Sequence, residues 1–574
     1  MNKYFILITC LLLLFVSSSS VDATQPIIAH HSIYKPVSAK NGMVVTGDKL
    51  ATREALRVLK EGGNAIDAAV TAGFVMAVTM PRAGNIGGGG FMLIYSAKER
   101  RVIAIDYREI APLKASRDMF IDKDGKVDNE LSRFSHLSAG VPGTVAGFAL
   151  ALKQYGTLSL KEALKPAIKY AKKGFILNDA FAADIERAVK RLRKWPATAK
   201  VFFKKDGSFY KARDKFIQKE LANTLKRIAS KGVKGFYEGP VANLIVAEME
   251  KGGGLISHED LASYKARVRV PVKGNYRGYE IFSMPPPSSG GSHIVQIMNI
   301  LEGYPLSKWG HNSGKTIHHM TEAMKFAYAD RSKYLGDPDF YTMPIKYLTS
   351  KAYSDKLNKR INSNKATPSS KIAPGNLLQY ESDETTHYAV ADKMGNVVAN
   401  TYTINFSFGS GIVVPGAGFL LNNEMDDFSA KPGTPNAYGL IGGEVNRIEP
   451  KKRMLSSMSP TILLKNGKPF LATGSPGGSR IITTTLQVIL NVIDHGMNIQ
   501  EAVNAPRIHH QWLPDEVRIE KGLSHDTVKL LEDKGHKVVI KRSMGAASSI
   551  MIDSKEGLFY GAADPRKEGL AAGY

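Results

Sequence analysis

Two threonines near the middle of the chain have the spacing of a nucleophile and its partner. Thr385 and Thr403 are 18 positions apart, and the residues between them read as two strands around a turn at Met394. Opposed residues of an antiparallel hairpin have a constant sum of residue numbers, so a hairpin centred on Met394 places Thr385 opposite Thr403. We therefore expect the two hydroxyls to lie side by side on one face.

A threonine hydroxyl is a poor nucleophile unless a neighbouring base takes its proton. One such base is the α-amine of the same threonine, which exists only if the chain is cut before Thr385. The ordinary pKa of an α-amine, about 7.7–8.0, suits a general base near neutral pH. On strand propensity alone, however, these residues are ordinary β-sheet threonines, so the assignment depends on the motifs around them.

Longer motifs stand in series along the chain. They are Gly84–Gly90, Asp106–Glu109, Gly140–Gly143, Thr385–Tyr388, Leu421–Phe428, Leu455–Pro460, Gly474–Arg480 and Ala571–Tyr574. In this order and spacing the chain resembles bacterial γ-glutamyltranspeptidases, and the resemblance covers essentially everything after residue 23.

The resemblance implies an α/β fold of the N-terminal nucleophile hydrolase type, a four-layer αββα sandwich. It also implies self-cleavage between Glu384 and Thr385, in which the Thr385 hydroxyl attacks the Glu384 carbonyl and water opens the ester. The products would be a helix-rich, basic large subunit (24–384) and a small subunit (385–574) that begins with the nucleophile. The two chains would form a heterodimer.

The resemblance also implies the active-site roles. Thr403 orients the Thr385 hydroxyl, and the backbone amides of Gly477 and Gly478 form the oxyanion hole. Glycines before a helical run suit that role by themselves, because they permit close approach and helix N-termini favour anions. An ordinary loop before a helix fits the same residues. A phosphate-binding loop fits less well, because the Lys-Ser/Thr pair is missing.

A γ-glutamyl substrate carries an α-ammonium and an α-carboxylate beyond the reacting carbonyl. By resemblance, the ammonium is held by Asn405, Glu424 and Asp427. The carboxylate is held by Arg108, Ser456 and Ser457, and arginine suits a planar, bidentate fit. Residues 432–449 read as a long surface loop, which resembles the family's lid, with Tyr438 as its gating aromatic. The alternative is that Tyr438 only packs within this loop and has no gating role.

The implied activity is that of a γ-glutamyltransferase that also hydrolyses glutathione. The γ-glutamyl group passes to water or to an amino acid or dipeptide acceptor, and no cofactor is implied. Two alternatives remain. One is an acylase of the same fold acting on another acyl group. Asp427 and Arg108 argue against it, and glutaryl groups lack the amine that Asp427 would hold. The other is a non-catalytic exported amino-acid-binding protein, which would not need Thr385.

The N-terminus predicts export. Lys3, the apolar run 4–16 and Val21-Asp22-Ala23 are typical of a signal peptide over residues 1–23. The apolar run is short of the roughly 20 residues that span a bilayer, so we expect no transmembrane segment in the mature chain and a periplasmic or secreted location. The single cysteine, Cys10, lies in this leader, which excludes disulfides and a cysteine nucleophile from the mature chain.

The formal net charge of +24 is unevenly distributed, because residues 385–574 are nearly neutral and +22 falls within 24–384. Lys190, Arg191, Arg193 and Lys194 form one cluster. A solvent-exposed basic face explains this cluster, and binding to an anionic surface or polymer is the alternative. No nucleic-acid motif accompanies the charge, so no nucleic-acid partner is expected.

The sequence predicts both helices and strands, and these elements must position the candidate site residues. Amphipathic helices are predicted over 53–61 and 64–80, over 159–173 with a Ser159/Glu162 capping box and a kink or break at Pro166, and over 220–230. Residues 385–574 are expected to alternate short strands with helices, among them 481–494 and 525–534. A helix is expected to begin near His293 and another near Asn178. Residues 363–376 predict a flexible linker before Thr385.

We consider three further features as candidate sites. The run Gly87–Gly90 lacks dinucleotide-site spacing and predicts a backbone role near the active site. His387 faces the same side of its strand as Thr385 and is a candidate contributor. The adjacent pairs His318-His319 and His509-His510 lack the i, i+4 spacing of a helical zinc motif, so no metal site is expected.

Overall fold

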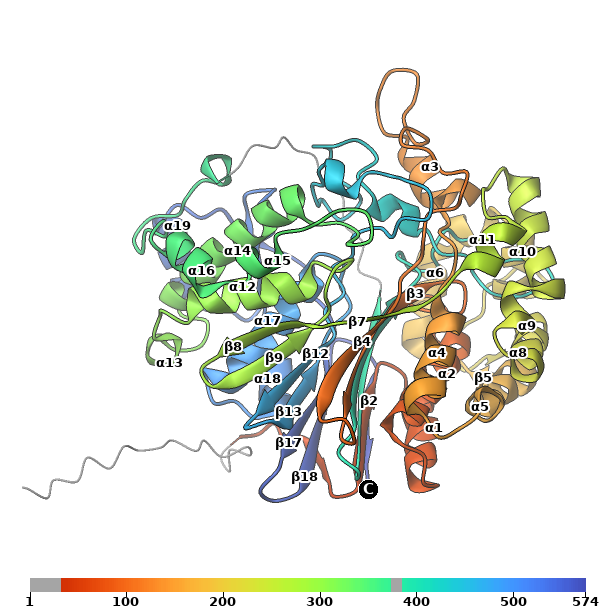
Figure 1. The fold of residues 1–574 in the computed structure, drawn as a ribbon, viewed down its shortest axis with the longest axis horizontal. Coiled ribbons are helices and arrows are strands. Elements are labelled where there is room, and N and C mark those ends of the chain that lie inside the picture. Colours follow the sequence, from red (N-terminus) through yellow and green to blue (C-terminus); the bar gives the residue numbers. More distant parts are fainter. Residues whose placement is uncertain (1–31, 373–384) are drawn as a thin grey trace, which may run out of the picture.

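A computed structural model describes residues 32–372 and 385–574. The expected signal peptide and Glu384 lie outside the described residues. Two seven-stranded sheets lie face to face, and helices cover the outer face of each sheet (Figure 1). The predicted mixed α/β fold is confirmed.

The sheet that carries the threonines has β10 and β11 at its centre. Its strand order is β19-β2-β10-β11-β3-β4-β7. The bounds are β19 Leu570–Gly573, β2 Gly42–Thr46, β10 Thr386–Asp392, β11 Val397–Thr403, β3 Gly89–Ser96, β4 Arg101–Tyr107 and β7 Arg267–Arg269.

The hairpin register is the predicted one. Thr386 pairs with Tyr402, and the pairing continues without a bulge to Ala391 and Val397. Every residue of both strands is buried. The side chains alternate between the two faces, so Tyr388 packs in the core under the helices, whereas Ala391 packs between the sheets.

The glycine run at the start of β3 permits close approach to the strand that ends in Thr403. A Cβ on Gly88 would lie 2.0 Å from the Thr403 carbonyl oxygen, and one on Gly90 would lie 2.5 Å from that of Thr401. No other residue type fits at those distances. This agrees with the predicted backbone role of Gly87–Gly90.

The second sheet has the order β1-β18-β17-β13-β12-β9-β8. Its bounds are β1 Val37–Ala39, β18 Leu558–Ala563, β17 Ser548–Asp553, β13 Lys468–Thr473, β12 Thr461–Lys465, β9 Tyr279–Ser283 and β8 Val272–Tyr276. Met43 and Phe91 of the first sheet pack with Ile462 and Ile550 of the second in the apolar layer between the sheets.

Helices α1 (Lys49–Lys60), α2 (Ala65–Thr79) and α4 (Thr144–Tyr155) cover the outer face of the first sheet (Figure 1). The prediction that α2 is amphipathic is wrong, because every one of its residues is buried. It lies between the sheet, α1 and α5. A helix that is buried on all sides is apolar all round and therefore has no polar face.

Helix α5 (Leu160–Lys173) begins with the predicted Ser159/Glu162 capping box and runs through Pro166 without interruption. The other helices on this side are α6 Asp179–Arg193, α7 Pro196–Phe202, α8 Lys219–Lys231, α9 Lys234–Tyr237, α10 Gly239–Gly252 and α11 His258–Ser263. The basic cluster lies at the end of α6, where Arg191 donates to the Ser407 carbonyl and Lys194 lies 3.9 Å from Glu130.

Helices α12 (Gly290–Leu301), α17 (Arg480–Ile493) and α18 (Ile499–Asn504) cover the second sheet, and α14 (Gly314–Tyr334) packs on α12. Further helices are α13 Leu306–Trp309, α15 Ile345–Leu348, α16 Lys351–Asn358 and α19 His525–Asp533. Within the described residues, no helix is both long and apolar enough to cross a membrane.

Strands from both sides of Thr385 interleave in each sheet. β10 and β11 lie between β2 and β3, and β12 pairs with β9. The parts of the chain before and after Thr385 therefore share both sheets.

The prediction of a flexible linker from residue 363 is wrong for its described part. The Ser369 N–H donates to Asp515 Oδ2 (2.8 Å), and the Trp512 indole donates to the Ser369 carbonyl (3.0 Å). Ala366 donates to the Lys534 carbonyl (2.8 Å). These partners are distant in sequence, which is why local composition could not reveal them. Residues 373–376 lie outside the described residues.

Candidate active site

The two threonine hydroxyls meet at the open end of the β10–β11 hairpin. Thr385 Oγ1 donates to Thr403 Oγ1 at 3.3 Å, and Thr403 Oγ1 accepts from the Asn405 N–H at 2.8 Å. Asn405 has a left-handed backbone (φ 71°), which turns its N–H back onto Thr403. The nucleophile candidate is thus held through two successive hydrogen bonds.

A pocket beside Thr385 gathers most of the predicted residues. The predicted residues that line it are Arg108, Thr385, Thr403, Asn405, Glu424, Asp427, Tyr438, Ser456, Ser457 and Gly478. Residues far apart in the chain are therefore brought to one place. Gly477 does not line the pocket and lies directly before Gly478. The pocket is also lined by Arg331, Leu440, Met458 and Ile481, which were not predicted.

A buried charge cluster forms one wall of the pocket. Arg108 Nη1 lies 2.6 Å from Glu424 Oε2, and Nη2 lies 2.5 Å from Asp427 Oδ2. Burial lowers the pKa of Arg108, but the charges of Glu424 and Asp427 more than offset this, so its pKa is raised. Burial raises the pKa of Glu424 well above its usual range, and Arg108 opposes that shift.

Glu109 is a third carboxyl beside this cluster. Its Oε2 lies 3.7 Å from Arg108 Nη1, and neither carboxyl oxygen has a hydrogen-bond partner among the described residues. Burial raises the pKa of Glu109 to about 8, and the charge of Arg108 opposes the rise. A buried carboxyl without donors is most stable in its neutral form.

Arg331 of α14 is a buried cation that the sequence analysis missed. Its Nε donates to Ser289 Oγ (3.1 Å) and its Nη2 donates to Ser457 Oγ (3.4 Å). No carboxylate lies within ion-pair distance of Arg331 in the described part of the chain. Burial lowers the pKa of Arg331 to about 10, which leaves it charged near neutral pH. An arginine near the end of a polar-looking helix carries no local signal of burial.

The Ser456-Ser457 turn is held by the loop before α12. Both the backbone N–H and the hydroxyl of Ser289 donate to the Ser456 carbonyl, each at 2.9 Å. Ser456 Oγ accepts from the Met458 N–H at 3.1 Å. The two serine hydroxyls are thereby fixed next to Arg331.

The predicted oxyanion glycines lie in the turn before α17. Gly477 (φ 132°) and Gly478 (φ 56°) both have backbone angles that L side chains rarely adopt. The Gly477 carbonyl accepts from the Arg480 N–H (3.0 Å), and the Gly478 carbonyl accepts from the Ile481 N–H (3.2 Å). These bonds form the first turn of the helix. The turn therefore lies at a helix N-terminus, where backbone N–H groups favour negative charge.

Tyr438 forms part of the pocket lining. Its hydroxyl donates to Asn405 Oδ1, and its ring packs edge-on against Phe406 at 5.7 Å. A Cβ on Gly478 would lie 2.4 Å from the Tyr438 ring, so this tyrosine lies directly over the glycine turn. It lines the same pocket as Thr385.

The histidines take other positions. His387 Nδ1 is 2.8 Å from Thr401 Oγ1, on the neighbouring strand, and burial lowers its pKa to about 3. His387 is therefore a neutral imidazole bonded to Thr401. His509 Nδ1 lies 2.8 Å from Thr483 Oγ1, and His510 Nε2 lies 3.1 Å from Asp515 Oδ1.

Comparisons with known proteins agree on one family. A family model described as gamma-glutamyltranspeptidase matches residues 51–574. A glutathione hydrolase proenzyme of Escherichia coli (strain K12) is 56% identical over 543 residues, covering 94% of this chain and 93% of the relative.

Two solved structures are similar to this one. A cephalosporin acylase from Bacillus halodurans has a TM-score of 0.85 at 30% identity and covers 95% of this chain and 98% of its own. A Helicobacter pylori gamma-glutamyltranspeptidase has a TM-score of 0.56 at 50% identity and covers 57% of this chain and 94% of its own.

The raised pKa of Glu109 predicts a pH-dependent stability. Between the ordinary carboxyl pKa and about 8 the folded state holds a proton that the unfolded state releases, so stability falls as pH rises through this window. Glu109→Gln cannot titrate and should remove that loss. We expect its thermal midpoint to exceed that of the wild type more at pH 9 than at pH 5.

The matched control is Glu186→Gln, an exposed glutamate on α6. It should follow the wild-type midpoint at every pH. Equal pH slopes for wild type and Glu109→Gln would contradict the prediction.

Proposed function

Because the chain belongs to the γ-glutamyltranspeptidase family and is a glutathione hydrolase proenzyme, we propose that Thr385 is both the site of self-cleavage and the nucleophile of turnover. The observation that carries this proposal is the contact between the Thr385 and Thr403 hydroxyls at the edge of the charged pocket. A binding protein without turnover has no need of this arrangement.

In the proposed cleavage, Thr385 Oγ1 attacks the Glu384 carbonyl and the peptide bond becomes an ester. Water then opens the ester, which frees the Glu384 carboxylate and the Thr385 α-amine. The products are residues 24–384, after removal of a signal peptide over 1–23, and residues 385–574. The interleaved strands of both sheets support a lasting heterodimer, because separating the chains would expose both sheets.

In turnover, the new α-amine takes the proton from Thr385 Oγ1 as the oxygen attacks the γ-carbonyl of glutathione. The N–H groups of Gly477 and Gly478 are assigned to the oxyanion that develops. The proton passes to the leaving nitrogen, and cysteinylglycine departs. Water, or the amine of an amino acid or dipeptide, then attacks the γ-glutamyl ester and restores Thr385. No step requires a cofactor.

The two ends of the γ-glutamyl group match the two kinds of charge in the pocket. Asn405, Glu424 and Asp427 are assigned to the α-ammonium, and Arg108, Ser456 and Ser457 to the α-carboxylate. Tyr438 is assigned as the lid, because it lines the pocket and bonds to Asn405. These assignments follow the family resemblance and agree with the lining of the pocket.

We assign Arg331 to the α-carboxylate as well, as a substrate-positioning residue. Arg108 is already paired with Glu424 and Asp427, whereas Arg331 donates to the neutral hydroxyls of Ser289 and Ser457. A buried cation whose partners are hydroxyls gains most from an incoming anion. Ser457 bonds to Arg331 and lines the pocket, so it can bridge Arg331 to the substrate.

The fold supports the N-terminal nucleophile hydrolase type, a four-layer αββα sandwich formed jointly by the two cleaved chains. We further propose that the protein is exported, to the periplasm or the medium, because residues 1–23 have the pattern of a signal peptide.

An acylase acting on another acyl group is the second candidate, and the likeness to the Bacillus halodurans cephalosporin acylase favours it. Asp427 argues against it. Its carboxylate lines the pocket and faces Arg108, where it can receive a substrate ammonium. A glutaryl group has no ammonium to place there.

Thr385→Ala should abolish both cleavage and turnover. We expect intact mass and N-terminal sequencing to give two chains for the wild type, one of them beginning at Thr385, and a single chain for the variant. Thr386→Ala is the matched control, since its hydroxyl lies on the other side of the strand, and it should still be cut. Cleavage of Thr385→Ala at the same position would overturn the proposal.

Asp427→Asn should reduce the preference for γ-glutamyl over glutaryl substrates. Loss of a charged hydrogen bond, about 1.5–3 kcal/mol, corresponds to a roughly 10–150-fold drop in the ratio of kcat/KM for γ-glutamyl and glutaryl p-nitroanilides. Asp426→Asn is the control, because Asp426 bonds to Ser132 and Arg133 instead. A wild type that prefers glutaryl substrate would favour the acylase.

Arg331→Gln should raise KM for γ-glutamyl p-nitroanilide more than it lowers kcat. Its discrimination between this substrate and the analogue with an α-carboxamide should fall by roughly tenfold or more, since the lost interaction is with the carboxylate charge. Arg331→Lys should restore part of that discrimination. A purely structural role for Arg331 would lower the activity on both substrates equally.

A further inference from the structure

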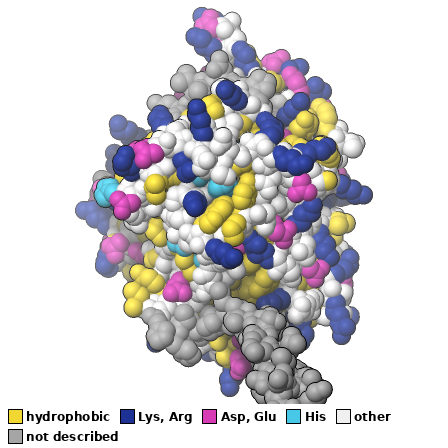
Figure 2. Space-filling model, turned by 90° about the vertical axis from the view of Figure 1, so that its left-hand side faces the viewer, with side chains coloured by type: hydrophobic (Ala, Val, Ile, Leu, Met, Phe, Trp, Pro, Cys, Tyr) yellow, Lys and Arg dark blue, Asp and Glu magenta, His cyan; other side chains and the backbone are white. Residues whose placement is uncertain are grey.

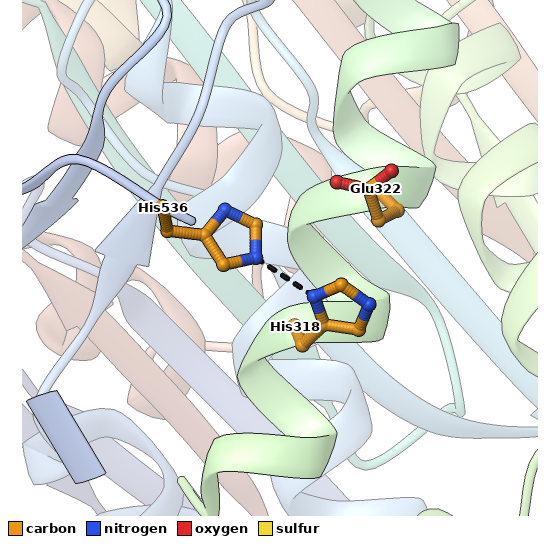
Figure 3. Close-up of side chains that lie close together, drawn as sticks. All are labelled: His318, Glu322 and His536. Carbon is orange, nitrogen blue, oxygen red and sulfur yellow. Dashed lines mark hydrogen bonds between the residues drawn. The ribbon is translucent and has the colours of Figure 1, made fainter. Parts of the chain in front are cut away.

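Three buried side chains outside the active site converge beside α14. His318 and Glu322 lie one turn apart on that helix, and His536 comes from the segment between α19 and β16 (Val538–Ile540) (Figure 3). Their ligand atoms all lie within 4.8 Å of one another. None of the three lines the Thr385 pocket, so the proposed reaction leaves them without a role.

The hydrogen bonds of His318 orient its ring for coordination. His318 Nε2 is 2.8 Å from the Asn362 carbonyl oxygen, which can only accept, so Nε2 carries the proton. Nδ1 therefore presents its lone pair toward His536 Nε2 at 2.8 Å. A histidine that donates one ring nitrogen to a backbone carbonyl and offers the other is the usual arrangement of a metal ligand.

Glu322 keeps one oxygen available. Its Oε1 accepts from Lys325 Nζ at 2.8 Å, and the Thr367 N–H is shared between Oε1 (3.3 Å) and Oε2 (3.2 Å). The Lys325 ion pair therefore holds the carboxylate by one oxygen. Figure 3 shows the carboxylate on the same side of α14 as the two rings.

We propose that His318 Nδ1, His536 Nε2 and Glu322 bind one divalent transition metal ion of the zinc class. Two imidazoles and a carboxylate with an open fourth position suit Zn²⁺ and its neighbours rather than Ca²⁺ or Mg²⁺, which prefer all-oxygen ligands. Binding requires the two ring nitrogens to move from 2.8 Å to about 3.3 Å apart, as Zn–N bonds of about 2.0–2.1 Å with tetrahedral angles dictate.

A polar cavity of about 180 Å³ lies beside the site and is bounded in part by His536. It is lined by His536 and Lys325 together with His510, Asp515 and Lys537, among others. On the face that carries α14, α16 and α19, histidine side chains reach the surface among scattered basic and acidic groups (Figure 2). A water in this cavity can occupy the fourth position.

We expected no metal site because the adjacent histidine pairs lack the i, i+4 spacing of a helical zinc motif. The i, i+4 partner of His318 is a glutamate, and the third ligand is 218 positions away. His318 and Glu322 precede Thr385 and His536 follows it. If the proposed cleavage occurs, the metal ion joins the two subunits.

The test uses the full-length Thr385→Ala protein, so that metal binding is measured independently of cleavage and turnover. After EDTA treatment and removal of the chelator, titration with ZnCl₂ should give about one bound ion per chain, and the thermal midpoint should rise by several degrees. Co²⁺ should give the visible absorption of a tetrahedral nitrogen and oxygen site.

His536→Gln should lose both the bound ion and the rise in thermal midpoint. His525→Gln, an exposed histidine on α19, is the matched control and should behave like its parent. Failure of the parent protein to bind Zn²⁺, or equal binding by both variants, would overturn the proposal in favour of a purely hydrogen-bonded cluster. If His536→Gln does not fold, the Co²⁺ spectrum of the parent decides: absence of the tetrahedral band overturns the site.

Discussion

The antiparallel pairing of β10 with β11 is the constraint on which the active site depends. A slip of one residue would turn every side chain of these buried strands to the opposite face. Tyr388 would then face the second sheet, and Thr385 would lose Thr403. The strands on either side, β2 and β3, prevent that slip, and the glycines at the start of β3 let its backbone reach the Thr403 carbonyl. Packing on both faces thus holds two hydroxyls 3.3 Å apart.

Burial of charge determines what the pocket can accept. Three carboxyls and two arginines lie close together in this site, and Glu424 and Asp427 both turn to Arg108. Arg331 is left with serine hydroxyls. A zwitterion supplies an ammonium for the acids and a carboxylate for the arginines, so it fits this pocket better than a substrate that carries only one charge.

Helix α14 connects the pocket to the boundary between the two parts of the chain. Near its end Arg331 faces the pocket, and a few turns earlier Glu322 and Lys325 hold Thr367 just upstream of residue 373. His318 on the same helix meets His536 from beyond Thr385. One rigid element therefore positions a substrate-facing cation and holds the segment that leads toward Thr385.

The sequence by itself determined the features that depend on neighbours in the chain. The hairpin register, the Ser159/Glu162 cap and the close-approach glycines follow from local spacing, and the family motifs supplied the lining residues of the pocket. Only the tertiary structure decided that α2 is enclosed, that residues 363–372 are anchored, that Arg331 faces the pocket and that Glu322 meets His536. The reason is physical: burial and long-range hydrogen bonds depend on groups that are distant in sequence and adjacent only in the fold, so no local pattern carries them.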